Sequence, residues 1–397
     1  MPPIDGQPAD VSIADPRCLV TGATGYVGGR LVPRLLKRGY AVRALARTPA
    51  KLSEVPWRAD VEVAEGDLDD VESLAAALDG VDVVYYLVHS MGTSADYASE
   101  EDRSATNVVA AARAAGVRRL IYLGGLHPTG RELSAHMTSR TSVGQHLLDS
   151  GIEAVVLQAG VIIGSGSASF EMVRHLTDVL PVMTTPKWVH NQIQPIAIHD
   201  VLHYLVEAAT ADIGQSRTWD IGGSDILDYG EMMQIYAEAA GLAKRRILVL
   251  PLLTPTLASL WVGLVTPIPS GLARPLVESL QDDAVTSEHD IDGVIAAPAE
   301  GLTSYRRGRA EPRARRDRRH RADLVGCLTA SGTLGTVAQR PELGRRSGVQ
   351  DPTSRLQRGQ RRRIMEGCRS RPGPQPLACV PAGVASSGQR PMDGGRM

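Results

Sequence analysis

The stretch that decides the fold of this chain is Thr21-Gly-Ala-Thr-Gly-Tyr-Val-Gly28. It follows a short apolar strand, Arg17–Val20, and runs into a helical pattern, Tyr26–Arg38, which Gly39 closes. A second strand pattern, Ala41–Ala46, comes next. Strand, glycine-rich turn, helix and strand in this order are typical of a dinucleotide-binding βαβ unit. In such a unit the diphosphate of the dinucleotide lies against the turn, at the start of the helix.

Each glycine of this turn has a separate physical reason. Gly22 permits the tight turn, Gly25 lets the backbone approach the diphosphate, and Gly28 allows the helix to pack closely on the strand. Free amide groups and the positive end of the helix dipole then attract the anion. An ordinary glycine-rich turn is the alternative, but the flanking elements favour a cofactor. The predicted contacts are Gly22, Thr24, Gly25, Tyr26, Val27 and Gly28.

Apolar runs and helical patterns keep alternating after this unit, which predicts a parallel sheet with helices on both faces. Further strands are expected at Val61–Ala64, Val81–Val88, Leu120–Leu123 and Ala154–Gln158. Helices are expected from Asp69, with Glu72 as its capping partner, to Leu78, then over Asp96–Ala115 and Thr138–Leu148. The fold class is therefore α/β, a doubly wound parallel-sheet Rossmann domain.

Beyond Gly160 the pattern loosens and predicts a small C-terminal substrate lobe over the carboxyl ends of the strands. A helix is expected at Phe170–Leu180, and short strands at Ile193–Ile198 and Thr218–Ile221. The predicted organisation is a flexible N-terminus at 1–15, a Rossmann core at 16–160, further sheet and helix elements with the lobe at 161–305, and an Arg-rich tail at 306–397.

The tail differs sharply in composition from the rest of the 397-residue chain. From Arg306 onward there are 21 Arg, 7 acidic residues, no Lys and no aromatic residue. With so little apolar material to bury, this basic segment is predicted to be disordered. Binding to nucleic acid or anionic lipid is one interpretation. We favour another hypothesis, that the tail is read out of frame from GC-rich coding sequence, and expect no specific nucleic acid partner.

The residues after the second strand indicate which cofactor is bound. An acidic residue there would accept from a ribose 2′-hydroxyl and favour NAD(H). The sequence Val42-Arg-Ala-Leu-Ala-Arg47-Thr48 has none. Arg43 or Arg47 could pair with a 2′-phosphate, so NADP(H) is favoured, although both could also be surface arginines.

Residues at the ends of the next strands are further candidates for the cofactor site. Asp67 and Leu68 are placed to border the adenine, although Asp67 could also serve only to start the next helix. Leu87 and His89 end the fourth strand, at the edge where ligands bind in such sheets. His89 or Ser90 could contact the nicotinamide or a substrate, or else stabilise a loop.

Three longer segments carry a family resemblance, namely TGATGYVGGRLVPRLLKRGYAVRALAR, EGDLDD and NVVAAARAAGVRRLIYLGGL. They resemble the extended and atypical short-chain dehydrogenase/reductase superfamily, and most of all its NmrA-like, NAD(P)H-binding branch. The resemblance covers about residues 16–300, and its first 130 residues are the specific part. It implies a nicotinamide cofactor and a Tyr-x-x-x-Lys pair, in which the tyrosine is the acid/base and the lysine lowers its pKa and holds the ribose.

This chain lacks that pair, because no Tyr has a Lys four positions later. The corresponding helix reads His136-Met-Thr-Ser-Arg140. His136 could replace the acid/base, since histidine titrates near neutral pH, and Arg140 could replace the lysine as a fixed cation. Alternatively, other residues are catalytic, or the domain only binds its cofactor as a sensor or assembly protein. Both side chains could also simply lie on an exposed helix face.

Other histidines are weaker candidates for chemistry. His127 precedes Pro128 in a loop and is expected to be solvated, and the pair His199-Asp200 resembles a helix cap more than a catalytic dyad. Asn107, in the middle of its helix, is expected to bridge backbone groups rather than to be catalytic. No His or Cys cluster has the spacing of a zinc site, so no metal is predicted.

One segment raises the question of membrane contact. Ile247–Ala273 has no charged residue, but four prolines interrupt it, which favours a buried or substrate-lining segment over a membrane one. The N-terminus has no apolar stretch of signal-peptide type, and the four cysteines have no disulfide spacing, which fits the cytoplasm. We therefore expect an NAD(P)H-binding oxidoreductase or epimerase-like enzyme for a small apolar carbonyl compound. The alternatives are a non-catalytic regulator and a protein with peripheral membrane contact.

Overall fold

A seven-stranded sheet is the centre of the fold. The computed structural model describes residues 15–89, 97–128, 133–250 and 280–306. The strand order is β11-β6-β5-β4-β1-β2-β3, and every neighbouring pair is parallel. This arrangement confirms the predicted α/β fold of Rossmann type.

Most strands lie where the sequence predicts them. The sheet comprises β1 (Arg17–Val20), β2 (Ala41–Ala46), β3 (Glu62–Glu65), β4 (Val83–Tyr86), β5 (Arg119–Gly125), β6 (Glu153–Ala159) and β11 (Arg217–Ile221). The last of these corrects the prediction, because the segment around Thr218 pairs with β6 at the sheet edge rather than building the lobe.

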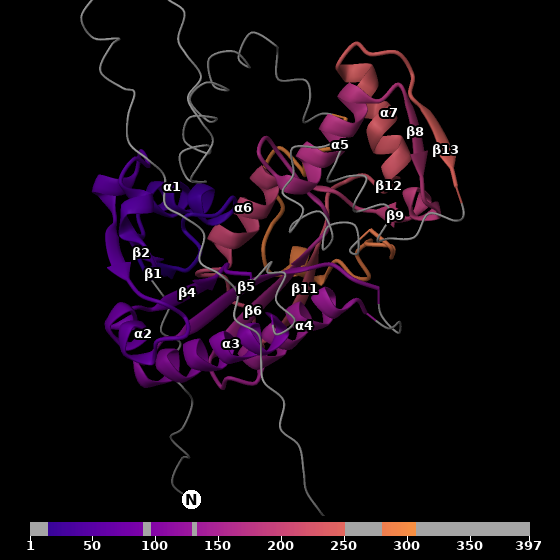
Figure 1. Ribbon diagram of the computed structural model, residues 1–397. Coiled ribbons are helices and arrows are strands. Elements are labelled where there is room, and N and C mark those ends of the chain that lie inside the picture. Colours follow the sequence, from indigo (N-terminus) through magenta and orange to yellow (C-terminus); the bar gives the residue numbers. More distant parts are fainter. Residues whose placement is uncertain (1–14, 90–96, 129–132, 251–279, 307–397) are drawn as a thin grey trace, which may run out of the picture. The chain divides into compact units, whose positions relative to one another are not determined.

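Helices cover both faces of this sheet (Figure 1). On one face lie α1 (Gly28–Arg38) and α6 (Ile198–Glu207); on the other lie α2 (Val71–Leu78), α3 (Tyr97–Ala114) and α4 (Ala135–Leu148). The four residues of β4 alternate between the two cores: Val83 and Tyr85 pack on the α1 side, and Val84 and Tyr86 on the other. Both faces are buried, which explains why these strands are continuously apolar in the sequence.

The strand order reverses between β1 and β4, and this switch point positions the site. Thr21 joins the two strand ends: its Oγ1 donates to the carbonyl oxygen of Tyr85 over 3.0 Å and accepts from the amide of Leu87, also over 3.0 Å. In open parallel sheets, ligands bind in the crevice at the carboxyl ends of strands at such a point.

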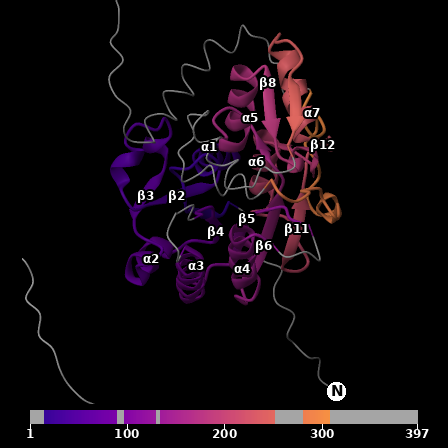
Figure 2. The ribbon, with the colours of Figure 1, turned by 45° about the vertical axis from the view of Figure 1, so that its right-hand side comes forward.

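The second part of the fold is a lobe with its own core. It contains α5 (Ala168–Val179), α7 (Tyr229–Ala239), β8 (Val182–Thr185) and β13 (Arg246–Val249) (Figure 2). Its short strands are β7 (Ile162–Ile163), β9 (Gln192–Ile193), β10 (Ile196–Ala197) and β12 (Leu227–Asp228). The structure also has short 3-10 helices, both inside and outside the lobe: η1 (Pro49–Leu52), η2 (Arg58–Asp60), η3 (Lys187–His190) and η4 (Asp290–Gly293). The predicted strand Ile193–Ile198 is split, because Pro195 has no amide to donate.

Residues 280–306, which we call the C-terminal strap, return to the sheet and the lobe. Buried or half-buried carboxylates accept its backbone amides: Ser287 donates to Asp220 over 2.7 Å, and Thr303 donates to Asp200 over 2.8 Å. The amide of Tyr305 donates to Asp225 over 2.6 Å. The N-terminal segment 1–14, the Arg-rich tail after Arg306 and most of the uncharged segment 247–273 lie outside the described residues, so the predictions made for them are not tested.

Candidate cofactor site

The glycine turn between β1 and α1 has the geometry that the sequence motif requires. Gly22 has a φ of +68°, and a Cβ there would lie 2.8 Å from the carbonyl oxygen of Leu87. A Cβ on Gly28 would lie 2.8 Å from the carbonyl carbon of Gly22. Both clashes involve backbone atoms, which cannot move aside. The turn therefore stays tight only because these positions have no side chain.

The start of α1 is open to an anion. The helix begins at Gly28, two residues later than predicted, so Tyr26 and Val27 belong to the turn. The N-cap residue Val27 makes no side-chain hydrogen bond, and the first turn of the helix has no acidic residue. A helix start without a side-chain cap, whose positive dipole faces a glycine cradle, fits the diphosphate of a dinucleotide.

Tyr26 links this turn to the lobe. The guanidinium of Arg30 stacks 4.1 Å from the centre of the Tyr26 ring, and Arg30 also donates to the carbonyl oxygens of Tyr26 (3.1 Å) and Ser165 (3.0 Å). A Cβ on Gly164 would collide with the hydroxyl of Tyr26. Sequence reasoning missed Arg30 and Gly164, because only the fold brings residues 30 and 165 together.

The two arginines proposed for the 2′-phosphate behave differently. Arg43 is buried, donates to the carbonyl oxygens of Ala77 (2.6 Å) and Asp79 (2.8 Å), and pairs with Glu62 at 2.9 Å. Two of these partners stand at the end of α2 and the third is on β3, so these contacts give Arg43 a structural role and correct the prediction. Arg47 is exposed directly after β2 and remains the candidate for the phosphate.

The residues after β3 form a compact loop, in which both Asp67 and Leu68 make hydrogen bonds within the protein. Asp67 accepts the amide of Asp69 over 3.2 Å, and the carbonyl oxygen of the buried Leu68 accepts the side-chain amide of Asn107 over 3.0 Å. The N-cap of α2 is Asp70, not Asp69, whose carboxylate pairs with Arg103 at 3.1 Å. Asn107 therefore bridges to the backbone as expected, although it reaches another element. The adenine contact of Asp67 and Leu68 stays a prediction.

His89 follows β4 and is fixed against the neighbouring strand. Its Nε2 lies 3.0 Å from the carbonyl oxygen of Leu123, which can only accept, so Nε2 carries the proton. Burial and the charge of Arg140 hold the pKa of His89 well below its usual range. The imidazole is thus a neutral group beside the switch point, with Leu87 directly before it; Ser90 lies outside the described residues.

His136 lies in the first turn of α4. This helix starts at Ala135, three residues earlier than predicted, because Ser134 caps it by accepting the amide of Met137 over 3.3 Å. His136 is only 7% exposed, which rules out an exposed helix face for it. Burial, and then the charge of Arg140, lower its pKa to about 4, so the side chain is neutral at pH 7.

Arg140, one turn further, holds its guanidinium beside the end of β5. A Cβ on Gly125 would lie 3.3 Å from its Nη1, so the missing side chain at 125 makes room for the wide arginine head. The Nε of Arg140 is buried without a hydrogen-bond partner among the described residues. Burial lowers the pKa of Arg140, and nearby Tyr122 and Glu101 oppose that effect. A buried donor with no partner indicates a position for a polar ligand.

A cavity of about 40 Å³ lies behind Arg140, between α4 and the sheet. This volume suits water and is too small for a substrate. His127 lies near this region and corrects a prediction, because it is half-buried rather than solvated: its Nε2 lies 3.1 Å from Nε2 of Gln158.

The pair His199-Asp200 is neither a dyad nor a helix cap. His199 is 64% exposed, and its Nδ1 lies 3.8 Å from the carboxylate of Asp200. Asp200 is buried and bonds the strap at Thr303, while the N-cap of α6 is Ala197.

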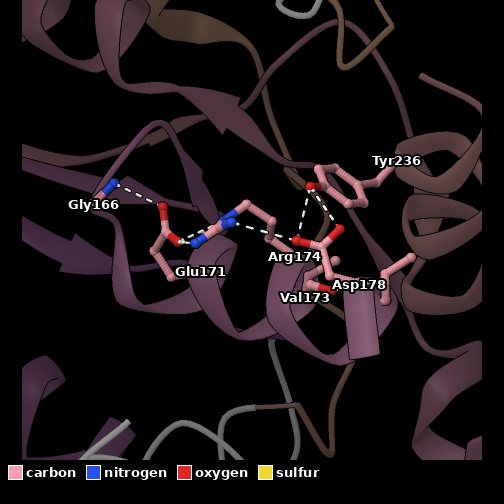
Figure 3. A network of polar contacts seen from close by, with 7 residues as sticks. Gly166, Glu171, Val173, Arg174, Asp178 and Tyr236 are labelled. Carbon is pink, nitrogen blue, oxygen red and sulfur yellow. Dashed lines mark hydrogen bonds and ion pairs between the residues drawn. The ribbon is translucent and has the colours of Figure 1, made fainter. Parts of the chain in front are cut away.

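A polar network holds α5 to α7 within the lobe (Figure 3). Glu171 accepts the amide of Gly166 over 3.1 Å and the Nε of Arg174 over 2.6 Å. Arg174 reaches Asp178 at 3.4 Å, and the hydroxyl of Tyr236 donates to the same carboxylate over 3.0 Å. The loop beside Tyr26 is thereby connected to both helices of the lobe.

Comparisons with known proteins agree with this geometry. Residues 22–163 match a family described as NAD(P)H-binding. A 3β-hydroxysteroid dehydrogenase/Δ5→4-isomerase of Mycobacterium tuberculosis is 33% identical over 141 residues, which are 31% of this chain and 37% of the relative. Sterol demethylase protein B of Methylococcus capsulatus is 37% identical over 123 residues, 28% of this chain and 37% of the relative. The chain thus spans little more than a third of the length of these relatives.

Solved structures share the fold over a longer stretch. An NADPH-dependent quinone oxidoreductase of Escherichia coli, in complex with NADPH, has a TM-score of 0.59 at 20% identity and covers 74% of this chain and 98% of its own. A nucleoside-diphosphate-sugar epimerase of Staphylococcus aureus has a TM-score of 0.60 at 16% identity, with coverage of 74% and 100%. The chain therefore carries an NAD(P)H-binding domain that resembles the short-chain dehydrogenase/reductase superfamily in both sequence and fold.

Proposed function

We propose that the protein is an oxidoreductase that moves a hydride between NADP(H) and a small apolar carbonyl compound, or the alcohol paired with it. The observation that carries this proposal is the pair formed by the buried His136 and the half-buried Arg140 on α4, whose guanidinium lies beside Gly125 at the carboxyl end of β5 and has a buried Nε without a partner among the described residues. An isomerisation would also use His136 and Arg140; in that case the cofactor would first take the hydride from the substrate and then return it. The dehydrogenase named among the relatives supports this class of reaction.

Arg47 supports NADP(H) as the preferred cofactor, because it is exposed at the end of β2 and no acidic residue stands between Val42 and Thr48. NAD(H) is the alternative cofactor, and titration with NADPH and NADH distinguishes the two. The NmrA-like branch and a cytoplasmic location belong to the same proposal.

His136 and Arg140 have distinct parts in the proposed reaction. The bound cofactor would accept or supply the hydride at C4 of its nicotinamide. His136 is neutral at pH 7 and can take the hydroxyl proton of the alcohol on an imidazole nitrogen, then return it in the reverse direction. Arg140 does not exchange protons; its guanidinium can donate to ribose oxygens and keeps His136 neutral.

A second candidate is a non-catalytic NADP(H)-sensing regulator or assembly protein. The absence of a Tyr-x-x-x-Lys pair favours it. Two measurements on the purified full chain separate the two: titration with NADPH and NADH, followed by turnover of a panel of apolar ketones and secondary alcohols.

The decisive variant is His136→Gln, with His146→Gln as its control, because His146 lies on the same helix but is 40% exposed and pairs with Asp102. The enzyme proposal predicts that His136→Gln lowers kcat at least 100-fold with NADPH affinity nearly unchanged, while His146→Gln has wild-type rates. Tight NADPH binding without turnover of any substrate, and no effect of His136→Gln, would instead support the sensor.

A further inference from the structure

Strands β8 and β13 form a two-stranded parallel ribbon at the outer margin of the lobe (Figure 1). We define the ribbon as residues 182–185 and 246–250. The amide of Leu250 donates to the carbonyl oxygen of Thr185 over 2.8 Å, so the pairing continues to the end of the described segment. Side chains of a strand alternate between two faces, and the two faces of this ribbon differ in their surroundings.

The inner face packs on the core of the lobe. Met183 is fully buried, and Ile247 and Val249 pack against the same cluster. This face explains why the ribbon is fixed in place although it has only two strands, since an isolated pair of strands is marginally stable.

The outer face is apolar where a polar face is the rule for a half-buried sheet. Val182 is 48% exposed, Leu248 53% and Leu250 43%, and Val179 at the end of α5 is 51% exposed. These four are the majority of the six large apolar side chains that are exposed among the described residues. Apolar surface gathered in one place indicates contact with a partner or a membrane.

Exposed cations flank this face; the carboxylate of Asp178, directly before Val179, is engaged by Arg174 and the hydroxyl of Tyr236, and Lys244 also lines a cavity with Glu231 and Glu238. Lys187 follows β8, and Lys244 and Arg246 stand at the start of β13, all three exposed. Residues 179–191 and 241–250 contain no Asp or Glu. Apolar side chains between exposed cations are complementary to an anionic lipid surface, whose headgroups pair with the cations while the acyl boundary accepts the apolar groups.

The sequence that continues from the ribbon has the same character. From Ile247 to Ala273 the chain carries no charged residue, although residues after Leu250 are outside the described part. The stretch of sequence directly after the ribbon therefore contains no Asp or Glu. Among the described residues, no helix is long and apolar enough to cross a membrane.

We propose that the outer face of the β8–β13 ribbon docks the protein peripherally on an anionic lipid bilayer. Val182, Leu248 and Leu250 enter the headgroup boundary, and Lys187, Lys244 and Arg246 pair with lipid phosphates. Nucleic acid is the less suitable partner. Its phosphodiesters would pair with the cations, but the exposed valine and leucine side chains between them would have no apolar group to contact.

The test is sedimentation of the full-length protein with vesicles of phosphatidylcholine alone or with 30% phosphatidylglycerol. The double variant Val182→Asp/Leu248→Asp is compared with Val71→Asp, since Val71 is 50% exposed on α2, away from the ribbon. We expect at least five-fold stronger binding to the anionic vesicles, a ten-fold or greater loss in the double variant, and no loss in Val71→Asp. Circular dichroism checks that every variant is folded.

The Arg-rich tail is present in all three proteins, so it cannot produce a difference between them. Binding is also measured in 0.5 M NaCl, where the screening length is roughly 4 Å and purely electrostatic attachment is weak. Equal binding of wild type and double variant at both salt concentrations would overturn the proposal. So would a ribbon-dependent dimer in light scattering, or ribbon-dependent binding to duplex DNA, with no response to vesicles.

Discussion

The guanidinium of Arg43 donates a hydrogen bond to the carbonyl oxygen of Ala77 over 2.6 Å and so ties β2 to the end of α2. Arg47, four residues later, has left the strand and is exposed at the carboxyl edge of the sheet. Two arginines that the sequence places in the same role therefore differ in what they do. Their substitution separates cofactor preference from stability.

Arg47→Ala is expected to weaken NADPH binding by about ten-fold to 100-fold, because a charged hydrogen bond to a phosphate contributes about 1.5–3 kcal/mol. NADH binding should change little. Fluorescence titration with both cofactors measures the ratio. Arg43→Ala is the control: it should lower the free energy of unfolding and leave the NADPH-to-NADH ratio unchanged. A loss of preference in Arg43→Ala alone would contradict these assignments.

Gly28→Ala is expected to abolish cofactor binding, since the new Cβ would press on the backbone of Gly22 and open the turn. Gly293→Ala is a matched control, because a Cβ at that position meets nothing within 4 Å. Calorimetric titration with NADPH compares the two variants. A Gly28→Ala protein with wild-type affinity would show that the turn is not the cofactor cradle.

Stability should fall as the pH drops below about 6.5. The folded-state pKa of His136 is lowered to about 4, so between these values the unfolded chain binds the proton more readily than the folded one. The contribution of His136 is present above pH 6.5, is lost as the pH falls toward 4, and amounts to about 3 kcal/mol.

Urea unfolding at several pH values measures this slope in wild type and in His136→Gln. The variant should lose part of the slope, while His89, whose pKa is also lowered, retains the rest. Parallel curves for the two proteins would show that His136 does not titrate as described.

Asp200→Ala is expected to release the C-terminal strap. The buried carboxylate accepts both the amide and the hydroxyl of Thr303, and its removal leaves that amide without its partner, at a cost of about 1–3 kcal/mol. Thermal unfolding and proteolysis of the strap test this. Asp212→Ala removes an exposed local hydrogen bond and should have little effect.

The fold could be predicted from the sequence because its signals are local. Arg17–Val20 and Ala41–Ala46 have the predicted bounds, since each is a buried run that ends at a glycine-rich turn or a charged residue. Helix α4 starts three residues before the predicted Thr138, because Ser134 caps it through its contact with Met137. His136 therefore lies inside the helix and is more deeply buried than the pattern indicates.

The site was less predictable where it depends on distant residues. The glycines follow from spacing alone, and their geometry agrees with the motif. The role of Arg43 depends on the end of α2, thirty-four residues away, and the space for the Arg140 head depends on Gly125 in another element. Contacts between distant helices and strands produce no periodic pattern of residues, so they could not be predicted from the sequence.

The strap is held through its main chain as well as its side chains. Ser287, Thr303 and Tyr305 each offer an amide, which every residue except proline possesses, whereas the acceptors are individual carboxylates of the body. These amide bonds survive most substitutions in the strap, whereas loss of Asp200, Asp220 or Asp225 removes an acceptor that no other part of the strap supplies. Homologous proteins should thus preserve the acidic anchors of this last segment long after the segment itself has become unrecognisable by sequence.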